Sequence, residues 1–244
     1  MNIETAKTFS FQSDMKTFYE EHGFISIKNC IPLGALSLIK NDLDDLFGGY
    51  DAACFKLATE DKPKLYELHK AANLLVSIRS LASLFGETVI ALGNEKPVIE
   101  ISSGILLGLP KDTRLTYDFH QESNFMKGFG DILNVHYPIF RQSNTENGTM
   151  SGLDKSHKLG TLAFQKSRIS EDSYTNLIPT DIESVAPQFK EVHFQLDIGD
   201  CLFFHKDFIH KSNFNNSELC RPVGISRMTQ DASGDFNPRS PDEL

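Results

Sequence analysis

Thr116-Tyr117-Asp118-Phe119-His120-Gln121-Glu122 places a histidine and a carboxylate two residues apart in the middle of the chain. Side chains two apart on a strand point to the same face, so His120 and Glu122 can address one metal ion if this segment is extended. A third candidate, His210, closes the stretch Cys201-Leu202-Phe203-Phe204-His205-Lys206-Asp207-Phe208-Ile209-His210. Two imidazoles and one carboxylate form the ligand set of non-heme Fe(II) oxygenases, which keep coordination positions open, and they also suit Zn(II), Mn(II) or Co(II).

The composition is that of an ordinary globular protein, with 40% hydrophobic and 23% charged residues in a chain of 244. This length fits a single domain, which we expect to span residues 1–230, followed by a polar tail over residues 231–244. The net charge of -9 argues against a nucleic-acid-binding surface. We therefore expect a small-molecule substrate rather than an anionic polymer, and a monomer or small homo-oligomer.

Nothing in the sequence indicates a membrane or an oxidising compartment. No stretch approaches the roughly 18 consecutive apolar residues of a membrane span, and residues 1–11 lack the apolar core of a signal peptide. The cysteines at positions 30, 54, 201 and 220 show no Cys-x-x-Cys spacing, so we expect reduced thiols. These features predict a cytoplasmic protein without membrane contact.

The period of the apolar residues changes along the chain. In the first third it predicts one strand at Phe24–Lys28 and three helices, around Met15–Tyr19, over Pro32–Phe47 and over Pro63–Phe85. From Pro97 onward it predicts strands over Val98–Leu107, Arg114–His120, Ile132–Tyr137, Thr149–Leu153, Glu191–Leu196, Cys201–Phe204 and Val223–Thr229. Helices followed by many short strands indicate an α+β domain, mainly β, with a sandwich or barrel. The polar segment Gly48–Pro63 has the length of an active-site lid.

An arginine follows the last candidate histidine across a turn-rich stretch, residues 213–217. An antiparallel hairpin at that turn would bring Arg221 beside Ser212 and within reach of the face that carries His210. The guanidinium fork matches a carboxylate bidentately, so a dicarboxylate cosubstrate can chelate the metal at one end and pair with Arg221 at the other. The alternative for Arg221 is a surface arginine on an edge strand.

Four motifs resemble those of the phytanoyl-CoA dioxygenase-like family of Fe(II)/2-oxoglutarate oxygenases, over roughly Met15 to Met228. They are the opening segment Phe18–Ile27, the metal motif His120-Gln121-Glu122, the central segments Asn147-Gly148-Thr149-Met150 and Ser156-His157-Lys158-Leu159-Gly160, and the closing segment Gly199–Arg221. The metal motif and the closing segment, with its eleven-residue step from His210 to Arg221, are specific at their mutual spacing. The other two are weak when taken singly.

This resemblance implies a double-stranded β-helix, or jelly-roll, core with flanking N-terminal helices. It implies that Fe(II), 2-oxoglutarate and O2 are used to hydroxylate an unactivated C–H bond of a small molecule, with release of succinate and CO2. It also implies three iron ligands, His120, Glu122 and His210. Arg221, assisted by Ser212, is the implied partner of the far carboxylate of 2-oxoglutarate, and Gln121 is expected to line the cosubstrate pocket.

The sequence departs from the family pattern at three positions. The acid is Glu122 where the family usually has aspartate, and we keep it as a ligand because related oxygenases do use glutamate. His136 stands where an aromatic residue, usually tryptophan, is expected, and it either contacts the cosubstrate or substrate or is a packed core histidine. Lys155 replaces a glycine before Ser156. Because related halogenases lack the acid, its presence favours hydroxylation.

Two other classes of protein fit parts of the pattern. A Zn(II)-dependent hydrolase or isomerase could use the same three ligands, but it would need neither Arg221 nor 2-oxoglutarate. A jelly-roll protein that binds without catalysis could keep the fold, but the intact ligand set argues against it.

Overall fold

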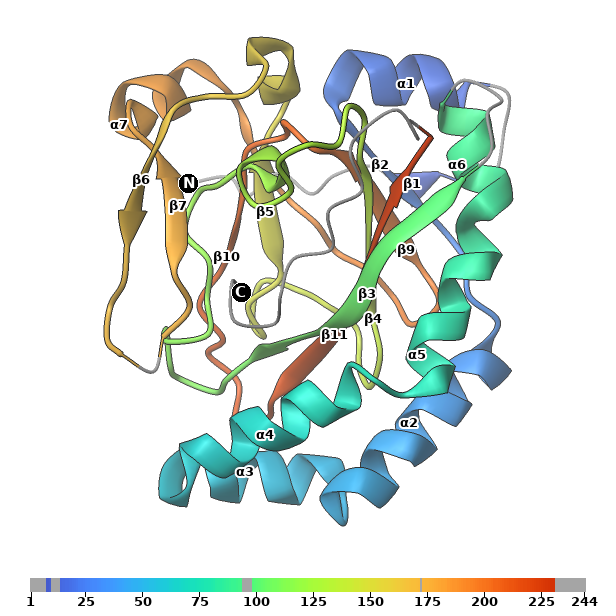
Figure 1. The fold of residues 1–244 in the computed structure, drawn as a ribbon, viewed down its shortest axis with the longest axis vertical. Helices are drawn as coiled ribbons and strands as arrows, with labels where there is room; N and C mark the ends of the chain where they lie inside the picture. Colours follow the sequence, from blue (N-terminus) through green and yellow to red (C-terminus); the bar gives the residue numbers. More distant parts are fainter. Residues whose placement is uncertain (1–7, 10–13, 94–97, 172, 231–244) are drawn as a thin grey trace.

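The strands of the chain form two sheets and one separate hairpin, as seen in a computed structural model that describes residues 8–9, 14–93, 98–171 and 173–230 (Figure 1). The tail predicted at residues 231–244 lies outside the described residues. The larger sheet, named here the major sheet, has six strands in the order β1 (Thr8–Phe9), β2 (Phe24–Ile27), β9 (Cys201–His205), β4 (Leu133–Pro138), β11 (Arg221–Thr229) and β3 (Ile99–Gly108). The minor sheet has the order β10 (His210–Ser212), β5 (Met150–Leu153) and β8 (Glu191–His193). The hairpin joins β6 (Phe164–Ser167) to β7 (Asn176–Pro179).

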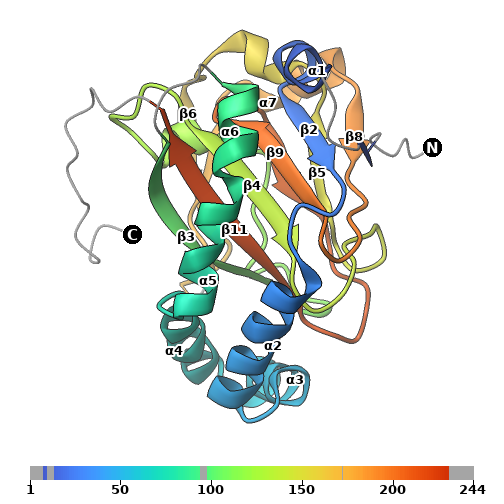
Figure 2. The ribbon, with the colours of Figure 1, turned by 90° about the vertical axis from the view of Figure 1, so that its right-hand side faces the viewer.

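Seven of the eleven helices in the described residues end by residue 92, and Figure 2 shows α6 and α5 in front of the major sheet, with α2 below them in this view. The helices are α1 (Met15–His22), α2 (Leu33–Phe47), α3 (Tyr50–Glu60), α4 (Lys62–Ala72), α5 (Val76–Ser80), η1 (Leu81–Phe85), α6 (Gly86–Leu92), η2 (Glu122–Asn124), η3 (Ser156–Leu159), α7 (Ile182–Val185) and η4 (Ala186–Gln188). Among the described residues, no single helix is long and apolar enough to cross a membrane, while the bent pair Lys62–Ala72 and Val76–Leu92 passes the same test of length and composition together.

Strand alternation divides the buried side chains into two clusters on opposite faces of the major sheet. On the outer face, Val135 and Phe203 pack with apolar residues of the helices, such as Ile39 and Leu43 of α2. On the inner face, Phe204 packs in a second cluster with residues of the minor sheet and its flanks, namely Met150, Val192 and Phe194. The second cluster therefore joins the two sheets face to face, as in a jelly roll.

Local signals in the sequence explain where α1 and α4 end or begin. The N–H of Gly23 donates to the carbonyl of Tyr19 and ends α1 in the left-handed region, at φ 80°. A side chain at Gly23 would also collide with the His157 ring, because an added Cβ would lie 2.2 Å from its Nδ1. At the start of α4, the Asp61 carboxylate accepts the N–H of Lys64 and Pro63 lies in the first turn.

The predicted α+β class with a jelly-roll core and N-terminal helices is confirmed, and most predicted strands lie within a few residues of the observed ones. Three local predictions are wrong. The segment predicted as a lid is helix α3, whose Tyr50 and Cys54 are fully buried. The long helix predicted from Pro63 is divided into α4, α5, η1 and α6. The strand predicted over Arg114–His120 is absent, and only His120 pairs, in an isolated bridge.

Candidate metal centre

Three buried side chains converge in this structure, and they are the three that the sequence predicts. One donor atom from each of His120, Glu122 and His210 lies within 4.8 Å of the others. The Glu122 Oε1 atom is 3.7 Å from the Nε2 atom of His120 and 3.7 Å from that of His210. The two imidazole centroids are 4.1 Å apart. This is the ligand number and type of a two-histidine, one-carboxylate centre.

A short piece of antiparallel pairing sets the spacing of the two histidines. The N–H of His120 donates to the carbonyl of His210 at 2.9 Å, and the N–H of His210 donates back at 3.1 Å. Residues that face each other in such a pair place their side chains on the same side. Gln121 is extended, at φ -121° and ψ 138°, so Glu122 returns to the side of His120 as η2 begins. A regular strand is therefore not needed to bring the three side chains together.

Main-chain carbonyls orient both imidazoles. The Nδ1 atom of His120 lies 2.7 Å from the carbonyl oxygen of Asp118, and that of His210 lies 2.9 Å from the carbonyl oxygen of Phe208. Because a carbonyl oxygen can only accept, Nδ1 carries the proton in each ring and Nε2 presents its lone pair to the shared centre. Burial, followed by the neighbouring His120, lowers the pKa of His210, which keeps this ring neutral as a metal ligand must be.

The second oxygen of Glu122 is held by an arginine that the sequence reasoning missed. The Nε atom of Arg227 donates to Glu122 Oε2 at 2.7 Å. Burial by itself would raise the pKa of Glu122, but the charge of Arg227 and the two neighbouring imidazoles of His120 and His210 outweigh it, and the pKa is well below its ordinary value. A signal was present, because Arg227 lies in the predicted strand Val223–Thr229. It follows Arg221 by six residues, and this even spacing places both on one face of the observed β11.

Arg221 and His136 lie on the inner face, and each has a nitrogen atom without a partner among the residues that the structure describes. The Arg221 Nε donates to the carbonyl of Asn147 at 2.9 Å, but its buried Nη1 and the buried Nε2 of His136 have no hydrogen-bond partner among the described residues. Burial lowers the pKa of Arg221 to about 10. Burial, then Arg221 and His210, lower the pKa of His136 to about 3. Buried unpaired polar groups are costly, and a carboxylate ligand between the two would satisfy the guanidinium.

The predicted hairpin between Ser212 and Arg221 is wrong. Ser212 lies in β10 of the minor sheet, opposite Met150, whereas Arg221 begins β11 of the major sheet, opposite Gly108. The intervening residues therefore cross from one sheet to the other, as jelly-roll connections do. Arg221 still faces the interior because β11 alternates, and the described contact of its Nε is the Asn147 carbonyl rather than Ser212.

Gln121 does not have the role that was predicted for it. Its fully buried amide donates from Nε2 to the carbonyls of Gly160, at 2.9 Å, and Asp207, at 2.7 Å. Its Oε1 accepts the N–H of Leu162 at 2.8 Å. Strand-like alternation sends this side chain away from His120 and Glu122. We therefore correct the cosubstrate role to a structural one, in which Gln121 ties the ligand segment to two other loops.

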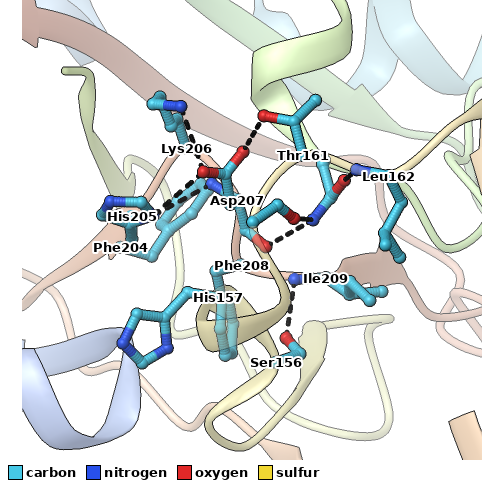
Figure 3. Close-up of polar contacts among 12 residues, drawn as sticks. Ser156, His157, Thr161, Leu162, Phe204, His205, Lys206, Asp207, Phe208 and Ile209 are labelled. Atoms are coloured by element: carbon cyan, nitrogen blue, oxygen red, sulfur yellow. Dashed lines mark hydrogen bonds and ion pairs between the residues drawn. The ribbon is translucent and has the colours of Figure 1, made fainter. Parts of the chain in front are cut away.

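Residues 156–162, named here the brace loop, contact both segments that carry the candidate ligands (Figure 3). The Ser156 Oγ accepts the N–H of Ile209 at 2.9 Å, directly before His210. The Thr161 Oγ1 donates to the Asp207 carboxylate at 2.6 Å. Together with the Gln121 contacts, these bonds fix the ligand segments relative to each other. The central motif Ser156-His157-Lys158 thus supports the segment that carries His210 and supplies no candidate ligand.

Comparisons with known proteins identify the family of this chain and proteins that share its fold. A family profile described as phytanoyl-CoA dioxygenase (PhyH) matches residues 19–223. A probable phytanoyl-CoA dioxygenase of Caenorhabditis elegans is 21% identical over 261 residues, which cover 90% of this chain and 80% of that protein. Two solved structures from nogalamycin biosynthesis share the fold. The non-heme alpha-ketoglutarate-dependent carbocyclase SnoK has a TM-score of 0.66 at 17% identity, covering 97% of this chain and 92% of its own. The epimerase SnoN, solved with Fe3+, alpha-ketoglutarate and nogalamycin RO, has a TM-score of 0.63 at 16% identity, covering 92% and 85%.

Proposed function

We propose that this chain, which belongs to the phytanoyl-CoA dioxygenase family, is an Fe(II)- and 2-oxoglutarate-dependent dioxygenase that hydroxylates an unactivated C–H bond of a small molecule. The observation that carries the proposal is the buried cluster of two imidazoles and one carboxylate. Three protein ligands leave the remaining positions of an octahedral ion for the cosubstrate and O2. When bound, iron and 2-oxoglutarate supply the oxidising power, with O2 consumed and succinate and CO2 released.

The residues of the chain supply positioning. His120, Glu122 and His210 hold the metal, and the carbonyls behind the two rings keep their Nε2 lone pairs aimed at it. Arg221 binds the far carboxylate of 2-oxoglutarate through the guanidinium nitrogen that has no partner among the described residues. His136, on the same inner face, lies close enough to Arg221 for its pKa to respond to that charge. All these groups are buried, which keeps water from the reacting centre.

Aromatic side chains beside His120 offer an apolar surface to the substrate. The rings of Tyr117 and Phe125 lie 5.1 Å and 5.6 Å from the His120 ring, and Tyr174 stacks on Tyr117 at 4.7 Å. A small molecule with apolar C–H groups can rest on this wall while its reacting carbon faces the metal. The Arg221 Nη1 atom, which has no partner among the described residues, distinguishes this function from a Zn(II)-dependent hydrolase, which has no use for a buried guanidinium at that position.

The first test asks whether the centre binds the metal and the cosubstrate. Anaerobic addition of Fe(II) and 2-oxoglutarate should give the visible charge-transfer band of a metal-chelated 2-oxo acid. His120→Ala should lose the band. Arg221→Gln should keep iron and weaken 2-oxoglutarate binding roughly 10- to 100-fold, since hydrogen bonds to a charged group contribute about 1.5–3 kcal/mol. Arg79→Gln, an exposed arginine of α5, is the matched control. An unchanged band in His120→Ala would overturn the ligand assignment.

A second test asks about the reaction itself. Because proteins of this fold also include an epimerase and a carbocyclase, the product must be identified and not only succinate. With 18O2, the proposed hydroxylation places one labelled oxygen atom in the product. A product of unchanged composition would support epimerisation, and a product that has lost two hydrogens would support ring closure or desaturation.

A further inference from the structure

We infer that Arg227 reserves an open coordination position by holding one oxygen of Glu122 away from the metal, an inference that rests on the proposed function. The two oxygens of Glu122 have separate partners in this structure. Oε1 faces the Nε2 atoms of His120 and His210, at 3.7 Å from each. Oε2 accepts from Arg227 Nε at 2.7 Å. The carboxylate therefore presents a single oxygen to the shared centre.

The number of ligating oxygens matters for this chemistry. Two histidines and one carboxylate oxygen occupy three of six positions, two more accept a chelating 2-oxo acid, and one remains for O2. A glutamate can also bind a metal through both oxygens. If Glu122 did so, the protein would occupy four of the six positions, and the chelating cosubstrate and O2 would compete for the remaining two. Arg227 removes this alternative by using the second oxygen.

The length of the acid and the place of the arginine fit each other. The carboxylate of Glu122 stands one methylene further from the main chain than an aspartate would, at the start of η2. It thereby reaches the two imidazoles and Arg227 at once. Arg227 comes from β11, on the inner face, 105 residues away in sequence, and its Nη1 lies 3.4 Å from Ser102 Oγ of the neighbouring strand β3. The arginine is thus held by the sheet and not by the loop that it restrains.

The charge of Arg227 acts in the same direction. A cation beside Oε2 makes that oxygen a poorer donor to a second cation, while Oε1 stays free to bind. The ion pair, whose carboxylate is buried and whose guanidinium is partly exposed, also leaves no uncompensated buried charge before the metal arrives. Arg227 acts through its contact with Glu122 Oε2, so its role is that of a positioning residue.

The experiment uses nitric oxide as a probe of the open position. Wild-type protein loaded anaerobically with Fe(II) and 2-oxoglutarate should give the electron paramagnetic resonance signal of an iron–nitrosyl centre. Arg227→Met keeps the bulk of the side chain and removes both the charge and the donors. We expect this variant to bind Fe(II), because its three ligand residues remain, but to lose most of its nitrosyl signal per bound iron, because both oxygens of Glu122 can then bind the metal. Arg227→Lys, which keeps a cation near Oε2, should recover part of the signal, and Arg79→Met is the matched control.

Each outcome decides the matter. A wild-type nitrosyl signal with an equal signal in Arg227→Met would overturn the inference and leave the proposed function intact. Loss of Fe(II) binding in folded Arg227→Met would also overturn it, because the arginine would then build the site and not reserve a position. If Arg227→Met does not fold, as judged by circular dichroism, Arg227→Lys decides, and a lysine variant that binds Fe(II) without any nitrosyl signal would contradict the inference. No charge-transfer band and no nitrosyl signal in the wild type would refute the proposed function itself.

Discussion

Replacing Gln121 by glutamate tests whether the residue between two candidate ligands is part of the scaffold. Glutamate has almost the same shape, so the substitution changes chemistry and little else. One carboxyl oxygen can still accept the N–H of Leu162, which in the wild type donates to Gln121 Oε1 at 2.8 Å. The other replaces an amide that donates to two carbonyl oxygens, those of Gly160 and Asp207, at 2.9 Å and 2.7 Å. An ionised carboxylate cannot face two carbonyls without losing both bonds, so the folded state must keep this group protonated.

The size of the effect follows from proton linkage. A glutamate in the unfolded chain has a pKa of about 4.3 and loses its proton above that pH, whereas the buried group keeps it. The folded state then binds more protons than the unfolded state, so the free energy of unfolding falls as pH rises, by about 1.4 kcal/mol per pH unit. At pH 7 the loss approaches about 3–4 kcal/mol, a large part of the stability of a domain this size.

Urea unfolding of wild type and Gln121→Glu at several pH values measures this slope. The control is Gln188→Glu in η4, where an exposed amide donates to the carbonyl of Ser184 at 2.8 Å. We expect the control to show no extra slope, because its carboxylate is solvated. The scaffold role would be refuted if Gln121→Glu unfolded like the wild type at every pH and instead lost 2-oxoglutarate affinity.

Two further substitutions test features outside the metal centre. His69 is buried with its Nε2 unpaired among the described residues, and burial lowers its pKa to about 4. As pH falls below about 6.5, the histidine of the unfolded chain binds a proton before the buried one does. The free energy of unfolding should therefore fall by up to about 3 kcal/mol between pH 6.5 and 4. His69→Leu should remove this pH dependence in urea titrations. Gly152→Ala would place a Cβ 2.2 Å from the Phe208 ring. Thermal melts should show a loss of roughly 1–3 kcal/mol, which Phe208→Leu partly restores if the collision is its cause.

The sequence predicts the donors of the candidate site better than it predicts what surrounds them. His120, Glu122 and His210 could be identified because metal chemistry demands few residue types and the spacing to Arg221 is distinctive. The change in apolar period after Pro97 predicted an α+β domain with a sandwich or barrel, and the family resemblance narrowed this to a jelly roll. These features depend on side-chain identity and on local periodicity, and both can be read directly from the amino-acid sequence.

What the sequence could not supply depends on contacts between remote segments. The polarity of the segment between Gly48 and Pro63 indicated a lid, but Tyr50 and Cys54 are turned inward by packing that only the fold creates. The turn after Ser212 looked like a hairpin, yet its two flanks belong to different sheets. Gln121 looked like a pocket residue because of its neighbours, and its true partners lie about 40 and 86 positions away.

The reciprocal hydrogen bonds between residues 120 and 210 have a consequence for how this centre tolerates change. They are made by the peptide groups themselves, at 2.9 Å and 3.1 Å, so the separation of the two imidazoles does not depend on which other side chains surround the centre. The side chains around the centre can be substituted to fit a different substrate without moving the two imidazole rings relative to each other. In such a scaffold the positions of the metal ligands are independent of the residues that contact the substrate. New substrate specificities can therefore arise by substitution of the substrate-contacting residues alone.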